Sequence, residues 1–302
     1  MSNTREIQKR IKSIQDTMKI TSAMYMISSS KLRTAKKKLE DAEPYFFTLQ
    51  YVISRMLRHI PKVHNVFFDQ RPNIPKTDRK RGFIVITADK GLAGSYNHNA
   101  IKKTHELLQL GEHNKIFAVG ELGRHFFSKE GLEVDKHFMY TVQKPTLHRA
   151  RVIEDYVLNQ YMTGELDEIY IIYTKMENAF TMATEFKKLL PMEPEDFSDI
   201  HIPYDTYREE VSFATDLDSL MSRVISSYFN GFLYGALVES YCSEQNSRMM
   251  AMEAATKSAK DMISALSKEY NQIRQAAITQ ELTEVISGAK AQKKKHQNGG
   301  VR

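Results

Sequence analysis

The residues whose types and spacing come nearest to a ligand-binding site form one loop, Asp89-Lys90-Gly91-Leu92-Ala93-Gly94-Ser95-Tyr96-Asn97. The loop follows an apolar, β-branched run at 82–88 and precedes a predicted helix. Backbone amides at a helix N-terminus, with Lys90 beside them, could bind an anion. The glycine spacing fits neither the dinucleotide fingerprint nor the P-loop. The alternative is a structural turn in which glycines let the backbone turn sharply and Ser95 or Asn97 caps the helix.

No other cluster of residues offers catalytic or metal-binding chemistry. The ten histidines are scattered, and His98, His105 and His113 have no ligand-like spacing with acidic residues. Cys242 is the single cysteine, so the chain can form no internal disulfide. No nucleophile, base and orienting group occur together in the pattern of a catalytic triad. We therefore expect no metal, no cofactor and no catalytic activity of the chain by itself.

Composition and charge set limits on the class of protein. A chain of 302 residues with 41% apolar content is long enough for one or two domains with a buried core. No apolar run has membrane-spanning length, and the N-terminus lacks the apolar stretch of a secretory signal. The net charge of +6 is uneven, because residues 1–40 carry a net +7 and residues 287–302 a net +5. Basic ends favour an acidic partner. For the C-terminal run, the alternative is a solvated, disordered tail.

The middle of the chain alternates strand-like and helix-like segments. Strands are predicted at 82–88, 115–120 and 168–175, with further ones at 180–190 and 200–207. Helices are predicted from the end of the glycine loop to about residue 110, and at 121–130 and 148–163. This alternation predicts an α/β layer with at least some parallel strand pairing.

The N-terminal segment has the pattern of a long helix. One set of positions steps forward by four and then three residues, and only Thr21 and Ser28 in it are plainly polar. The set is Ile7, Ile11, Ile14, Met18, Thr21, Tyr25, Ser28, Leu32, Ala35, Leu39, Ala42, Phe46, Leu49, Ile53, Met56 and Ile60. Such a seam buries one narrow stripe along a partner helix. Pro44 removes a backbone donor, so a kink or a break is expected there.

The best partner for this helix is the C-terminal segment. No proline occurs from Leu217 to Ala291. Its seam is first Ala259, Ile263, Leu266, Tyr270, Ile273 and Ala277, and then moves over by one residue to Ile278, Leu282, Val285 and Ala289. That slip should alter the local supercoil and leave the helix continuous. We expect the two terminal helices to pair antiparallel. The alternative is two separate helices of a globular bundle.

The predicted fold class is therefore α/β with a long antiparallel coiled coil, in which the N- and C-terminal helices pair around a central Rossmann-like α/β domain. We place the N-terminal coiled-coil helix at 1–60, a linker at 61–80 and the central domain at 81–210. The C-terminal coiled-coil helix occupies 211–291, and a basic tail occupies 292–302.

Several segments of the sequence resemble the gamma subunit of F-type ATP synthases, and the similarity runs over nearly the whole chain. The matching segments are 19–24 (KITSAM) with 31–33 (KLR), the loop 89–97 with Ala93 where cysteine is common, 243–252 (SEQNSRMMAM) with 254–256 (AAT), and 278–291 (ITQELTEVISGAKA). The last of these is the most specific. Four motifs in the right order and spacing identify the chain as a member of this family.

The resemblance implies a function that periodicity alone does not supply. The family's gamma subunit is a rotating central stalk whose coiled coil lies inside a ring of three alpha and three beta subunits. Its globular part rests with the epsilon subunit on the membrane c-ring. Rotation driven by ion flow forces each beta site in turn through different nucleotide affinities. The resemblance thus implies a non-catalytic rotor, peripheral to the cell membrane on its cytoplasmic side in a bacterial reading, with no nucleic-acid partner.

Four positions match family residues at or near the contact with the beta-subunit catch loops. Arg248, Thr279 and Gln280 match the contacts themselves, and Met24 matches a residue close to the same zone. Without the resemblance, Gln280 would be an exposed helix face and Met24 an apolar residue beside the seam. The family's beta loops are acidic, which suits the basic flank of Lys9, Arg10, Lys12 and Lys19.

The chain departs from the family pattern at two places. Phe213-Ala214-Thr215 stands where members often place an aromatic residue, a glutamate and a proline, so that c-ring contact is not carried over. Beyond Ala291 the chain continues through Lys293-Lys294-Lys295, past the point where many members stop. The rival function is a coiled-coil adaptor or nucleic-acid-binding protein that uses its basic termini, and its duplex binding would depend steeply on salt.

Overall fold

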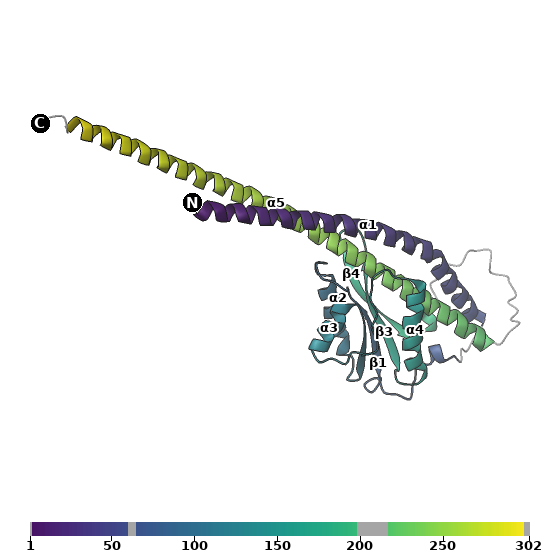
Figure 1. Cartoon of the computed structure of the whole chain (residues 1–302). Coiled ribbons are helices and arrows are strands. Elements are labelled where there is room, and N and C mark those ends of the chain that lie inside the picture. Colours follow the sequence, from purple (N-terminus) through teal and green to yellow (C-terminus); the bar gives the residue numbers. More distant parts are fainter. Residues whose placement is uncertain (1, 60–64, 198–216, 299–302) are drawn as a thin grey trace. The chain divides into compact units, whose positions relative to one another are not determined.

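The computed structural model describes the backbone of residues 2–59, 65–197 and 217–298 (Figure 1). Two compact units divide the chain, residues 1–26 together with 250–302, and residues 27–249. We call them the helical unit and the globular unit. The elements are α1 (Ser2–His59), η1 (Val66–Phe68), β1 (Arg81–Ile86), α2 (Tyr96–Leu108), β2 (Asn114–Val119), α3 (Glu121–Lys129), α4 (Leu147–Met162), β3 (Glu168–Met176), β4 (Met182–Leu190), η2 (Pro194–Phe197) and α5 (Leu217–Asn298).

The globular unit is built on a four-stranded sheet of order β2-β1-β3-β4. β1 pairs parallel with β2 and with β3, whereas β3 and β4 pair antiparallel through a hairpin. The crossovers between the parallel strands carry helices, as parallel pairing requires. The predicted strands at 82–88, 115–120, 168–175 and 180–190 and the parallel pairing are confirmed. The strand expected at 200–207 lies outside the described residues.

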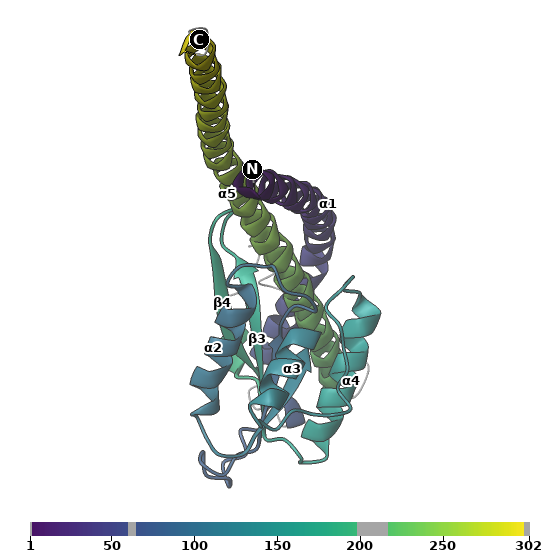
Figure 2. The same cartoon turned by 60° about the vertical axis from the view of Figure 1, so that its left-hand side comes forward.

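Helices cover both faces of the sheet, so alternate residues of β1 enter two different cores (Figure 2). Phe83 and Val85 pack with residues of α2 and α3, whereas Ile84 and Ile86 pack with residues of α4, α5 and α1. All six residues of β1 are buried. A strand covered on both sides reads as a continuous apolar run, and this is the run that the sequence showed. Cys242 on α5 is buried in the larger core.

The helical unit consists of the first turns of α1 and the distal part of α5. Gln8 Nε2 donates to Tyr270 Oη at 2.7 Å, and the hydroxyls of Thr21 and Thr256 lie 2.7 Å apart. The two pairs run in opposite directions along the sequence, so the helices are antiparallel, as predicted. Thr21 was a polar exception in the predicted seam, and its partner hydroxyl on α5 explains how the seam tolerates it.

The seam predicted for α1 faces inward along its length. Ile7, Ala35, Ile53 and Met56 are buried, and the other described seam positions are buried or half-buried. Of the kink or break expected at Pro44, the break is wrong, because α1 is one continuous helix with Pro44 inside it, and the kink stays a prediction. Packing on either side of the proline accounts for this: Ala42 contacts the larger core, and the Phe46 ring stacks on Tyr228 of α5 with centroids 5.2 Å apart.

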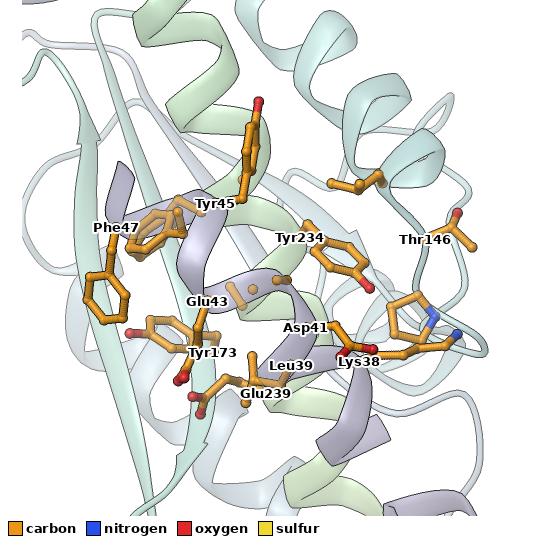
Figure 3. A pocket seen from close by; sticks show the side chains of 18 of the residues that line it. Lys38, Leu39, Asp41, Glu43, Tyr45, Phe47, Thr146, Tyr173, Tyr234 and Glu239 are labelled. Atoms are coloured by element: carbon orange, nitrogen blue, oxygen red, sulfur yellow. The ribbon is translucent and has the colours of Figure 1, made fainter. Parts of the chain in front are cut away.

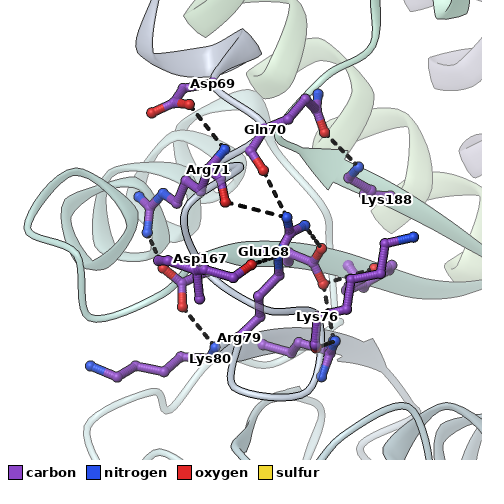
Figure 4. A network of polar contacts seen from close by, with 12 residues as sticks. Asp69, Gln70, Arg71, Lys76, Arg79, Lys80, Asp167, Glu168 and Lys188 are labelled. Carbon is purple, nitrogen blue, oxygen red and sulfur yellow. Dashed lines mark hydrogen bonds and ion pairs between the residues drawn. The ribbon is translucent and has the colours of Figure 1, made fainter.

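A buried ion network fixes the segment that leads into the sheet (Figure 4). Glu168 at the start of β3 accepts from Arg79 Nη1 at 2.7 Å and from Arg81 Nε at 2.9 Å. Arg71 forms an ion pair with Asp167 and donates to the carbonyl of Tyr161 at 2.9 Å. Each acid therefore holds an arginine from a segment that lies about ninety residues away in the sequence.

Candidate partner-binding sites

Arg248 on α5 lies at the glycine loop, inside the globular unit. Its side chain is 10% exposed, its Nη1 pairs with Glu244 Oε1 at 2.6 Å, and its Nη2 donates to the carbonyls of Lys90 and Gly91 at 3.1 and 3.2 Å. Burial raises the pKa of Glu244, and the Arg248 charge opposes that shift. Arg248 thus ties the loop to α5. A guanidinium with several donors in a fixed fork is suited to this role.

The backbone conformation of the loop explains why a glycine stands at position 94. Leu92 and Gly94 both have positive φ, at 63° and 55°. A β-carbon at Gly94 would lie 3.9 Å from the Ser247 carbonyl, so backbone conformation and not space requires the glycine. Tyr96 is buried, and burial raises its pKa, with the Glu244 charge adding to the shift.

The polar residues of the loop brace neighbouring elements. Ser95 occupies the N-cap of α2 without a side-chain capping bond, and Asn97 Oδ1 accepts from the amide of Ala88 at 2.8 Å. The expected cap from Ser95 or Asn97 is therefore wrong, because Asn97 closes the turn back onto the end of the strand. Asp89 Oδ1 accepts from the amide of Glu121 at 3.3 Å. These contacts agree with the structural-turn alternative.

Beside the exposed Lys90, the loop presents an apolar side chain to solvent. Leu92 is 64% exposed at its tip, and Phe180 in the β3–β4 hairpin is 80% exposed. The hairpin also contacts α5, because Asn246 Nδ2 donates to the carbonyl of Ala179 at 2.9 Å. Neither exposed residue was singled out in the sequence, since a lone apolar residue in a loop has no periodic neighbour to mark it.

Thr279 and Gln280 lie on the distal part of α5, in the helical unit. Both are exposed, and their side-chain bonds stay within the helix, from Thr279 Oγ1 to the Gln275 carbonyl at 2.9 Å and from Gln280 Nε2 to Glu284 Oε1 at 3.0 Å. α5 continues here beyond the N-terminal end of α1 (Figure 1). The two polar side chains are therefore open to a partner.

An exposed apolar stripe runs beside these two residues. Ile278, Leu282, Val285 and Ile286 are between 48% and 70% exposed. These residues include most of the shifted stripe predicted from the sequence, and the helix continues through it as expected. Exposed apolar residues grouped on one helix form a candidate surface for contact with another protein.

The structure does not bring Met24 close to Gln280. Met24 is half-buried on α1, three residues beyond Thr21, which pairs with Thr256. Gln280 lies 24 residues farther along α5 than Thr256, and a rise of 1.5 Å per residue makes that distance about 36 Å. Met24 and Gln280 therefore belong to different stretches of the helical unit. Arg248 belongs to the other compact unit.

The described parts of the chain hold neither a metal site nor a membrane-spanning helix. No group of three or more His, Cys, Asp or Glu side chains among the described residues is arranged to hold a metal ion. Within the same residues, no helix combines the length and the apolar character needed to span a bilayer.

Comparison with known proteins shows the family. The family described as ATP synthase matches residues 3–292. The gamma chain of the ATP synthase of Acetivibrio thermocellus is 40% identical over 298 residues, covering 97% of this chain and 100% of the relative. The sodium ion specific gamma chain of Acetobacterium woodii is 34% identical and covers 96% of this chain and 98% of its own length.

Solved structures agree with these relatives. A chain in the central stalk/c-ring structure of the Tetrahymena thermophila mitochondrial ATP synthase aligns with a TM-score of 0.58 at 26% identity, covering 78% of this chain and 99% of that one. A chain of the Euglena gracilis mitochondrial ATP synthase shares the fold, with a TM-score of 0.64 over 100% of this chain and 97% of its own, at 17% identity. The fold and the relatives define a subunit of the rotary ATP synthases. Within that class, the chain belongs to the family of ATP synthase gamma chains.

Proposed function

We propose that this chain is the rotating central-stalk subunit of an F-type ATP synthase and couples transmembrane ion flow to ATP synthesis or hydrolysis at the catalytic ring. The observation that carries the proposal is family membership over residues 3–292, together with a paired helical unit whose distal end is exposed and apolar. The subunit binds no nucleotide in this scheme. It changes the relative free energies of the conformations of the catalytic sites, as an allosteric element does.

The proposed partners are the alpha and beta subunits around the helical unit, and the c-ring and the epsilon subunit at the globular unit. The exposed stripe beside Gln280 supports a contact with the ring, and so does the basic flank, because Lys9, Arg10, Lys12 and Lys19 are all exposed. An acidic loop on a beta subunit would complement that flank. The c-ring position at 213–215 and the side chains of the tail at 292–302 lie outside the described residues.

Further parts of the proposal rest on the resemblance. The subunit acts peripherally, on the cytoplasmic side of a bacterial cell membrane. The division into helices at 1–60 and 211–291, a linker at 61–80, a central domain at 81–210 and a tail at 292–302 is the proposed functional division. Family membership leaves the coupling ion open, because the relatives include a sodium-specific gamma chain.

The catch-loop contacts proposed for Met24, Arg248, Thr279 and Gln280 are best tested at Gln280. Its side chain is exposed and hydrogen-bonds to Glu284 on its own helix, so Gln280→Ala removes the proposed outward contact and one bond within the helix. We expect coupled ATP synthesis in membrane vesicles to fall about threefold or more, as loss of about 0.7 kcal/mol of interaction would produce. Gln143→Ala, an exposed glutamine in the globular unit, serves as the matched control.

Two results would count against this proposal. Unchanged synthesis by Gln280→Ala in fully assembled enzyme would remove Gln280 from the contact. Failure of the tagged chain to co-purify with six larger nucleotide-binding subunits, with duplex binding that weakens steeply as salt rises, would favour the rival nucleic-acid-binding function. Arg248→Ala is a poorer test, because it also releases the glycine loop.

A further inference from the structure

A cavity of about 650 Å³ lies in the globular unit between α1, α5, β3 and the loop before α4 (Figure 3). Its size is typical of small-molecule sites, which usually span about 300–1,000 Å³. All of its lining residues belong to the globular unit. None of the four residues proposed for the catch-loop contacts lines it, so a ligand here goes beyond the proposed rotor function.

The cavity exists because two glycines on one face of α5 have different surroundings. A β-carbon at Gly231 would meet Phe46 at 3.6 Å and Leu49 at 3.9 Å, so α1 and α5 are in contact there. A β-carbon at Gly235, one turn later, would meet nothing within 4 Å. The helix surface is thus bare of side chain at the place where the cavity lies.

Aromatic rings and carboxylates line this space. The rings come from α1 and α5 and from β3, and they include Tyr45, Phe47, Tyr173 and Tyr234. Faces of such rings attract cations within about 6 Å of the ring centre, and the attraction grows when water is excluded. The lining therefore favours a ligand with an apolar body and a positive charge.

The charges of the lining favour the same ligand. The lining holds three carboxylates and two ammonium groups, those of Asp41, Glu43 and Glu239 and of Lys38 and Lys175. The carboxylates of Glu43 and Glu239 lie near each other beside Tyr173 (Figure 3). Burial raises the pKa of Glu239, Lys175 opposes the shift, and the charges of Glu185 and Glu43 add to it. A cation placed between the two carboxylates would relieve their mutual repulsion.

We propose that this cavity is a binding site for a small amphiphilic organic cation, held by Glu239 and Glu43 and by the aromatic rings, with its apolar body over Gly235. The size of the cavity favours a small molecule over a partner helix, which needs a groove several turns long. The charge balance favours a cation over an anion of the same shape.

A matched pair of fluorescent probes tests the proposal on the purified full chain. Dansylcadaverine carries an ammonium group and dansylglycine a carboxylate on the same fluorophore. We expect the full chain to bind dansylcadaverine about tenfold more tightly, a ratio that corresponds to 1.4 kcal/mol. Equal affinity for the two probes would overturn the proposal.

Three variants locate the site. Glu239→Gln removes one charge without changing shape and is expected to weaken dansylcadaverine binding about fivefold to tenfold. Gly235→Leu fills the cavity and is expected to abolish binding of both probes, whereas Gly288→Leu, at the other α5 glycine with nothing within 4 Å of its β-carbon, leaves binding unchanged. Circular dichroism and thermal unfolding verify that each variant folds, and Gly235→Ala serves as a milder substitution if Gly235→Leu unfolds.

The last experiment measures dansylcadaverine binding to the assembled enzyme. Binding of dansylcadaverine to the assembled complex, lost in Gly235→Leu or Gly235→Ala, would establish a small-molecule site in the working protein. Binding to the free chain but not to the complex would show that another subunit covers the cavity, and the proposal would then be wrong. Retention of full affinity in both Gly235 variants would equally overturn it.

Discussion

The globular and helical units bury their side chains in different ways. In the globular unit all of β1 is buried, and the fully buried side chains include Phe83, Phe117 and Tyr161. In the helical unit, only Ile7, Met252 and Ala259 are buried among the residues whose side chains are described. The globular unit is stabilised by a three-dimensional core, and the helical unit by contacts along one stripe of each helix. A substitution in the first should therefore destabilise the chain far more than a similar one in the second.

The largest expected effect is at Glu168. Glu168→Gln leaves Arg79 and Arg81 buried without a counter-charge, and breaking such a pair typically costs about 3–5 kcal/mol. Glu253→Gln on the exposed face of the helical unit is the matched control, with an expected change of less than about 0.5 kcal/mol. Urea unfolding of the full chain followed by far-UV circular dichroism measures both. Equal losses from the two variants would contradict the comparison.

The same residue gives the globular unit a defined pH dependence. Burial raises the pKa of Glu168, but the Arg79 hydrogen bond, the Arg81 charge and the Tyr170 hydroxyl outweigh it and hold the pKa below its usual value. A carboxyl whose pKa is lowered by folding stabilises the folded state above its unfolded pKa, and that stability disappears as the pH falls through the folded value. The stability lost by wild type on acidification below about pH 4.5 should therefore be smaller in Glu168→Gln.

An intermediate effect is expected when the same apolar truncation is made in each unit. Ile171→Ala removes a fully buried side chain from β3 and should cost about 2–5 kcal/mol. Ile263→Ala removes a half-buried seam residue and should cost about 1 kcal/mol. Denaturant titrations of the two variants measure the difference. A larger loss for Ile263→Ala would mean that the seam contributes more than its burial indicates.

The smallest effect concerns the hydroxyl pair in the helical unit. A double-mutant cycle of Thr21→Val and Thr256→Val should give a coupling energy of about 0.5–1.5 kcal/mol, the usual net value of one hydrogen bond. Each single variant leaves the other threonine without its partner hydroxyl, so the double variant should lose less stability than the sum of the two single losses. A coupling energy near zero would mean that the two hydroxyls do not act as a pair.

The sequence predicted the elements whose burial leaves a regular pattern of apolar residues. β1 appeared as a continuous apolar run because both of its faces are covered, and the α1 seam appeared because one stripe of that helix faces inward. The predicted break at Pro44 was wrong because the prediction used the local preference of proline and took no account of the packing of Ala42 and Phe46. Tertiary contacts overrode the local preference there.

The sequence could not predict contacts between distant polar residues. The pairing of Glu168 with Arg79 and Arg81 spans nearly ninety positions, and no period or motif links these residues. The catch-loop contact that the resemblance implies for Arg248 stays a prediction, and no pattern in the sequence indicated that its guanidinium also binds carbonyls of the glycine loop. The empty space at Gly235 depends on how closely two helices approach, which a glycine in a sequence does not report.

The burial of Cys242 has a practical consequence for spectroscopy. Burial raises the pKa of its thiol to about 12, so the reactive thiolate is nearly absent at neutral pH and alkylating reagents have little access to it. Because the chain has one cysteine, a new one introduced on an exposed face becomes the dominant target for a maleimide dye or a spin label. Labels at the exposed positions Lys12 and Lys268 could then report the separation of the two helices in the native background, without a cysteine-free parent.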